Sequence, residues 1–439
     1  MFYGRDTLEI LRRISKYNSS CETISRFLSF SGYSFDISYL TLDSLPPLPS
    51  NIRKLVCCDG DIARIEKLPD DLREILCNSG RIRHLPALSS RLQKLTINRT
   101  GLLSLPELPK GLEYLGCPGN QIGELPVLPP SLTYLRCSYN PLSYLPPLPL
   151  VLETLDCTGT LLTSLPELPP TLKILICNST HLTQLPPLPE GLVELRCLET
   201  PIKFLPPLPS TLQILNCTGT SIKSLPELPK SLRTLIINKC KIVSLPPLPE
   251  SLLQLWCIRT SLREFPPLPK NLKELFFSDT NIGSLPPLPN SIDYLNCENT
   301  QLESLPTLPT SLQSLMCSHT KLKSLPEFPK NLQRVDCRNT QVSIIPEFSQ
   351  EMLRDFFDNT WVLNFRNSPI VVKPLPGESL KDYNTRWKPI REEDASRRRT
   401  LDKTRILKEE IVAAAWHPRR FEAWCLDEDE KRENTALFA

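Results

Sequence analysis

Apolar residues recur along most of this chain with a period of twenty residues. In one copy, Leu112–Cys117 reads L-x-x-L-x-C and Leu125–Pro129 reads L-P-x-L-P. Counted at the second leucine of the first segment, the phase runs from Leu55 to Val335 without insertion or deletion, which makes fifteen copies. A disordered proline-rich chain has no reason to keep such strict phase, whereas a stacked solenoid requires it.

The two segments predict the two sides of one coil. The second leucine and the cysteine of L-x-x-L-x-C are two residues apart, so in a short strand they share a side. Proline fixes φ and has no N–H, so the L-P-x-L-P limb should run extended, close to polyproline II, with its leucines turned inward. Parallel strands stacked in register then form one sheet, roughly 70 Å long at ~4.8 Å per strand.

This pattern resembles the leucine-rich-repeat family, and specifically the short subclass with LPxLP segments found in secreted effectors of enteric bacteria. The resemblance covers about residues 35–365 and implies a leucine-rich-repeat solenoid. The family usually carries asparagine at a position where ten of the fifteen copies here have threonine, and only Asn120 and Asn140 keep it. The resemblance implies a side-chain ladder that satisfies backbone groups at the turn, and a buried hydroxyl can do a smaller version of that.

The chain has sixteen cysteines, and twelve of them occupy the cysteine position of the repeat. The other three copies carry Ile97, Ile237 and Phe277 there, as a core position would allow. Disulfides between neighbours should fit poorly, because in-register Cβ atoms lie about 4.8 Å apart with parallel vectors. A straight row also cannot surround a metal ion tetrahedrally. We therefore predict that the cysteines pack as small apolar side chains, without metal or cofactor.

Three regions are predicted around this repeat. Residues 1–34 carry two segments with capping-box spacing and should form a helical cap. Residues 35–366 form the solenoid, with fifteen full repeats and a degenerate repeat at each end. Residues 367–439 form a loop followed by a helical tail, which makes the second cap.

The tail raises two alternatives for function. Its run AAAWHPRRFEAWCLD resembles C-terminal tails of proteins from very large DNA viruses, which implies a viral protein and, as one alternative, a structural component of the virion that contacts capsid proteins. Bacterial effectors of the same repeat subclass often carry a ubiquitin-ligase domain with a nucleophilic Cys-x-Asp motif, which Cys425 and Asp427 match. That domain is a large helical unit, whereas only residues 367–439 follow the solenoid here. The ligase is therefore the second alternative, and we predict no enzymatic activity.

Charge and hydropathy indicate where in the cell the protein is expected and which partners are disfavoured. No apolar signal-peptide region is present at the N-terminus, and no window reaches eighteen apolar residues. We expect a cytoplasmic protein, in the host cytoplasm or the virion if viral, that does not contact membranes. The formal net charge is +3, and the mixed charges expected on the sheet face disfavour nucleic acid.

Function is expected on the open face of the sheet, where side chains alternate with the core leucine and cysteine. Large apolar side chains on a solvent face are typical of protein interfaces. We therefore predict a non-enzymatic scaffold that binds another protein, whose identity the sequence does not give. Trp256, Phe276 and Tyr294 come from successive strands and should gather within about 10 Å. The full set of candidate partner-binding residues is Tyr114, Tyr134, Tyr139, Trp256, Phe276 and Tyr294.

Overall fold

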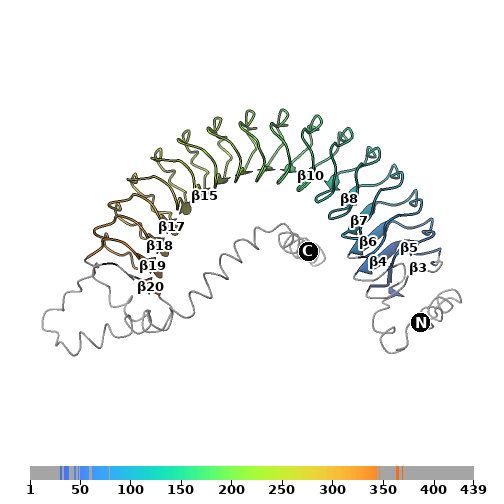
Figure 1. Cartoon of the computed structure of the whole chain (residues 1–439), viewed down its shortest axis with the longest axis horizontal. Coiled ribbons are helices and arrows are strands. Elements are labelled where there is room, and N and C mark those ends of the chain that lie inside the picture. Colours follow the sequence, from blue (N-terminus) through green and yellow to red (C-terminus); the bar gives the residue numbers. More distant parts are fainter. Residues whose placement is uncertain are drawn as a thin grey trace, which may run out of the picture.

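A computed structural model shows stacked coils that form an arch, with the β-sheet along its inner, concave side (Figure 1). A shorter pair of strands, β3 and β5, lies outside this sheet. The structure describes residues 30–31, 34–38, 44–45, 48, 50–58, 62–78, 80–343, 346, 362–364 and 368.

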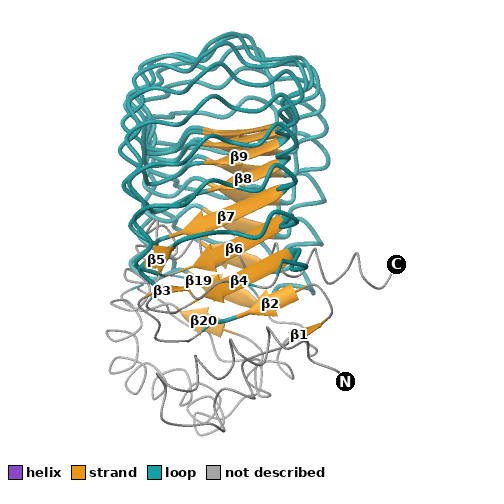
Figure 2. Cartoon of the chain, turned by 90° about the vertical axis from the view of Figure 1, so that its right-hand side faces the viewer, coloured by secondary structure: helices purple, strands orange, loops and turns teal. Residues whose placement is uncertain are grey.

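From β2 to β19 the main sheet is parallel, and its register is twenty residues. Leu155 lies opposite Leu135 on one side and Leu175 on the other. Figure 2 shows the strands stacked in one column. The strands are β1 (Phe30–Ser31), β2 (Ser34–Asp36), β3 (Ser44–Leu45), β4 (Lys54–Cys58), β5 (Arg64–Ile65), β6 (Glu74–Asn78), β7 (Lys94–Asn98), β8 (Tyr114–Gly116), β9 (Tyr134–Arg136), β10 (Thr154–Asp156), β11 (Ile174–Ile176), β12 (Glu194–Arg196), β13 (Ile214–Asn216), β14 (Thr234–Ile236), β15 (Gln254–Trp256), β16 (Glu274–Phe276), β17 (Tyr294–Asn296), β18 (Ser314–Met316), β19 (Arg334–Asp336) and β20 (Val362–Asn364).

Both sides of each coil contribute to one continuous core. In the copy quoted above, Leu115 and Cys117 are fully buried on the strand side, and Leu125 and Leu128 are buried from the opposite limb. That limb has no regular secondary structure in residues 101–113 or 117–133. The predicted two-sided coil, with inward leucines on both sides, is therefore confirmed.

Backbone hydrogen bonds continue from coil to coil beyond the ends of the strands. The N–H of Cys137 donates to the carbonyl oxygen of Asp156 at 2.9 Å, and the N–H of Tyr139 donates to that of Thr158 at 2.7 Å. Buried backbone groups need such partners, because an unpaired one costs free energy. The turn after each strand is thus held by its neighbour in the stack.

The threonine and asparagine position acts at this same turn. Asn120 Nδ2 donates to the carbonyl oxygen of Ile97 in the preceding coil at 2.7 Å, and its Oδ1 accepts from the N–H of Leu102 at 3.1 Å. The hydroxyl of Thr180 donates to the carbonyl oxygen of Cys177 in its own coil at 2.9 Å. The side chain of Asn120 therefore forms hydrogen bonds to the preceding coil. The hydroxyl of Thr180 forms one within its own coil, which is the smaller role predicted for it.

The cysteine column is buried, as expected for core residues. Burial raises the pKa of the Cys157 thiol well above its usual value. One expectation is wrong: Cys57 and Cys77 are joined by a disulfide. Their Cα atoms are 4.7 Å apart, and the parallel register brings them within the usual range of Cα separations for a disulfide.

The ends of the solenoid differ in part from the expected boundaries. Strand β1 pairs antiparallel with β2, so Phe30 and Ser31, which lie within the predicted cap region, pair with the sheet. Strand β20 pairs with β19 and closes the sheet, where a closing repeat was predicted. The two predicted helical caps fall on residues outside the described ranges.

Substitutions at Cys157 test the role of the column. Cys157→Val should fold normally and change the free energy of unfolding by less than about 1.5 kcal/mol, because the position accepts other apolar side chains. Cys157→Asp should lose several kcal/mol, because it buries a carboxylate without a partner. Denaturant unfolding of both variants measures the difference. An aspartate variant as stable as the valine variant would contradict a core role.

Candidate protein-binding face

The concave face consists of two rows of side chains. In β15, Leu255 is buried, while Gln254 and Trp256 on either side of it are half-buried and face outward. We call the row that contains Gln254 the first face row and the row that contains Trp256 the second face row. Because the register is twenty residues, side chains of one row lie beside each other on neighbouring strands.

Trp256 and Phe276 form a stacked pair in the second face row. They lie in register on β15 and β16, with ring centroids 5.3 Å apart and ring planes 16° from parallel. The ~4.8 Å spacing of adjacent strands suits this geometry. Both rings are half-buried, so the pair presents an aromatic surface to the concave side.

A chain of hydrogen bonds holds the indole of Trp256 in place. Trp256 Nε1 donates to Glu274 Oε2 at 3.1 Å. Gln254 Nε2 donates to the other carboxylate oxygen of Glu274 at 3.0 Å, and Thr234 Oγ1 donates to Gln254 Oε1 at 2.9 Å. Two of these bonds join residues twenty apart within the first face row. The twenty-residue period does not predict the third, because the bond of Trp256 to Glu274 crosses from one row to the other.

Tyr294 does not join the stack. It lies in the first face row, in register with Glu274, and is 41% exposed. Its hydroxyl is 3.4 Å from Gln313 Oε1, on the side of the next strand. Of the three residues expected to gather, the structure brings Trp256 and Phe276 into contact and turns Tyr294 toward Gln313.

A second aromatic pair lies nearer the N-terminal end. The rings of Tyr114 and Tyr134 stack with centroids 4.3 Å apart and planes 6° from parallel. Beside them, Arg136 Nε lies 3.2 Å from Asp156 Oδ2, with side chains only 10% and 13% exposed. This ion pair neutralises the face at β9 and β10.

Tyr139 lies in the turn after β9 rather than in the stack with Tyr114 and Tyr134. Its φ is +54°, and its ring covers Gly159, whose φ is +65°. A Cβ at Gly159 would lie 2.6 Å from Cδ1 of Tyr139, so this close approach and the backbone conformation both favour glycine. Burial, and then the charge of Asp156, raise the pKa of Tyr139 to about 12.

An apolar track connects the central strands and ends at the Trp256–Phe276 pair. Every residue in it is half-buried and belongs to one of the two face rows. Strand β12 interrupts the track with Glu194 and Arg196, which pair with each other. The six track residues are Ile174, Ile176, Ile214, Ile236, Trp256 and Phe276.

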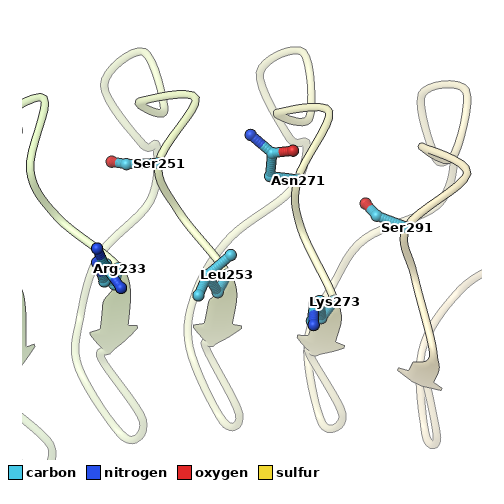
Figure 3. Close-up of a pocket in the computed structure, with 6 residues that line it drawn as sticks. All are labelled: Arg233, Ser251, Leu253, Asn271, Lys273 and Ser291. Carbon is cyan, nitrogen blue, oxygen red and sulfur yellow. The ribbon is translucent and has the colours of Figure 1, made fainter.

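A shallow pocket lies where β14–β17 begin, on the side of the first face row (Figure 3). Its serine hydroxyls are engaged with the backbone: Ser251 and Ser291 each donate to a carbonyl oxygen of the preceding coil at 2.7 Å. Arg233 and Lys273 are exposed, and among the described residues no carboxylate forms an ion pair with either. The pocket is lined by Arg233, Ser251, Leu253, Asn271, Lys273 and Ser291.

The described residues show neither a cluster of metal ligands nor a membrane-spanning helix. The described residues contain no group of three or more His, Cys, Asp or Glu side chains that could hold a metal ion. No helix with the length and apolarity to cross a membrane occurs among them. Apart from Ser368, the predicted tail, including Cys425, lies outside the described residues.

Comparison with solved structures shows bacterial leucine-rich-repeat proteins among the neighbours. YopM from Yersinia enterocolitica is 27% identical, with a TM-score of 0.66 over 85% of this chain and 97% of that chain. YopM from Yersinia pestis, described as a leucine-rich effector protein, is 24% identical, with a TM-score of 0.58 over 85% and 96%. No protein-family model and no curated protein matches the sequence.

A third neighbour comes from another bacterium. The functional domain of InlJ from Listeria monocytogenes, described as including a cysteine ladder, is 21% identical, with a TM-score of 0.53 over 67% of this chain and 64% of that chain. These likenesses, together with the twenty-residue coils, show that the chain has the fold of leucine-rich-repeat solenoids.

Neighbouring residues of β15 test the division between face and core. Trp256→Ala should change the free energy of unfolding by about 1 kcal/mol or less, because the side chain lies on the face. Leu255→Ala should lose about 2–5 kcal/mol, because it leaves a cavity between coils. Both values come from denaturant unfolding of the full chain. Equal losses would contradict the division.

Proposed function

We propose that this protein is a non-enzymatic scaffold that binds another protein through its concave sheet face, with the Trp256–Phe276 pair at the centre of the contact. The observation that carries the proposal is the stacked pair itself, half-buried on a solvent face and fixed by Glu274. Aromatic side chains dominate the binding energy of many protein interfaces. A side chain already held in one orientation loses less entropy on binding.

Two further observations support a binding role. The column thiols that could act as nucleophiles are buried, and burial raises the pKa of Cys157 and of Cys117, the latter to about 12. Thiols of that kind are inert, because the thiolate is the reactive form. Charges on the central face, such as Arg136 and Asp156, are paired, which disfavours tracking of nucleic-acid phosphates.

The proposal rests on the solenoid rather than on the tail. Bacterial effectors of known structure share the fold, and the cytoplasm remains the proposed setting. The virion-component and ubiquitin-ligase alternatives depend on residues 367–439, and nothing described in the solenoid favours either.

Affinity purification tests the proposal. Full-length tagged chain expressed in cells should retain a partner, identified by mass spectrometry, that Trp256→Ala/Phe276→Ala binds at least about thirtyfold more weakly, the loss expected for an anchor worth about 2 kcal/mol or more. Tyr114→Ala/Tyr134→Ala removes the other stacked pair of candidate residues from the same face, and a loss of binding in this variant instead would place the contact there. Undiminished binding by a normally folded Trp256→Ala/Phe276→Ala variant would place the contact elsewhere.

A further inference from the structure

We infer that the partner docks a single amphipathic α-helix along the apolar track, across the strands, with acidic residues on the side of Arg233 and Lys273. This inference rests on the proposed function and names the chemistry of the partner. It follows from the size of the track, from the pairing of its strands and from the distribution of charge around it.

The track has the dimensions of one helix face. It runs from β11 to β16, five strand intervals or roughly 24 Å at ~4.8 Å each. A helix rises 1.5 Å per residue, so about 16 residues cover that length. The two face rows lie about 7 Å apart along a strand, which suits the single apolar stripe that residues at i, i+4 and i+7 form on a helix.

Helical turns also match the strand spacing. One turn rises about 5.4 Å, close to the ~4.8 Å between strands, so successive turns meet successive strands. An extended peptide usually binds a sheet by adding a strand to a free edge. Strands β11 to β16 have no such edge, because each is paired with a neighbour on both sides.

Charged residues on the sheet face determine which side chains the helix can place against the track. Glu194 and Arg196 form an ion pair with each other where β12 interrupts the track. Glu274 accepts hydrogen bonds from Trp256 and Gln254. A charged side chain placed over them would be desolvated without a partner, so the facing stripe must be uncharged.

Exposed cations border the track mainly on one side. Arg233 and Lys273 line the pocket at the start of the strands (Figure 3). On the opposite flank Lys239 is exposed, but Arg259 lies 3.3 Å from Asp279. Acidic residues along one edge of the helix would complement Arg233 and Lys273, which favours one docking orientation.

Selection from a displayed library of random twenty-residue peptides tests this inference. The immobilised full-length chain is the target, and Trp256→Ala/Phe276→Ala is used for counter-selection. The peptides that survive should carry apolar residues at i, i+4 and i+7 with Asp or Glu along one edge. The best one, made synthetically, should gain helical circular dichroism on binding.

Two variants with the same change of charge at different positions test the predicted orientation of the helix. Arg233→Glu/Lys273→Glu should weaken that peptide at least tenfold. Lys230→Glu/Lys270→Glu should leave its affinity within about twofold, because it makes the same charge change at exposed turns away from the track. Any of three results would overturn the inference. The selected peptides could carry alternating or basic patterns, or no peptide could bind the original chain better than the Trp256→Ala/Phe276→Ala variant. The two charge reversals could also weaken the peptide equally. The proposed function would still hold in that case if a cellular partner bound the chain but not the Trp256→Ala/Phe276→Ala variant.

Discussion

The structure depends on one constraint, the parallel register of twenty residues between neighbouring coils. Leu155 lies between Leu135 and Leu175 in this register. A slip of one residue would move each core leucine to the solvent face and each face residue into the core. The same register places Trp256 beside Phe276, so the aromatic pair on the face is a consequence of the stacking that builds the core.

This register separates the residues that stabilise the fold from those that line the concave face. The three-residue strand β15 contributes Leu255 to the core, while Gln254 and Trp256 face the concave side. Stability comes from contacts between neighbouring coils, such as the hydrogen bond from the amide of Asn120 to the carbonyl oxygen of Ile97 in the preceding coil. Side chains on the face can therefore vary from coil to coil while the core stays nearly uniform. In this chain that freedom produces an apolar track beside exposed cations.

The strict period made the fold predictable from the sequence. It assigned the buried side of every strand, the inward leucines of the proline-containing limb and the rows to which Trp256 and Phe276 belong. It could not predict the bond from Trp256 to Glu274, because that bond depends on side-chain rotamers and joins two rows. For the same reason it did not predict that the hydroxyl of Tyr294 turns to Gln313.

The ends of the array were less predictable because the period fades there. Phe30 and Ser31 obey no repeat position, yet they form β1. The disulfide between Cys57 and Cys77 has a different cause, because both cysteines belong to copies in strict register. It contradicts the expectation that the Cβ spacing of a parallel ladder disfavours disulfides. The central copies, where the phase is strict, matched the expected burial.

The central claim, that the face can change without loss of the fold, is tested most directly by replacing all six track residues with threonine in one chain. Threonine keeps a strand-favouring, β-branched shape and removes the large apolar surface. The account predicts an unchanged circular dichroism spectrum and a loss in unfolding free energy no greater than that of Leu255→Ala alone, about 2–5 kcal/mol. An unfolded chain would contradict it, because the track would then be part of the core.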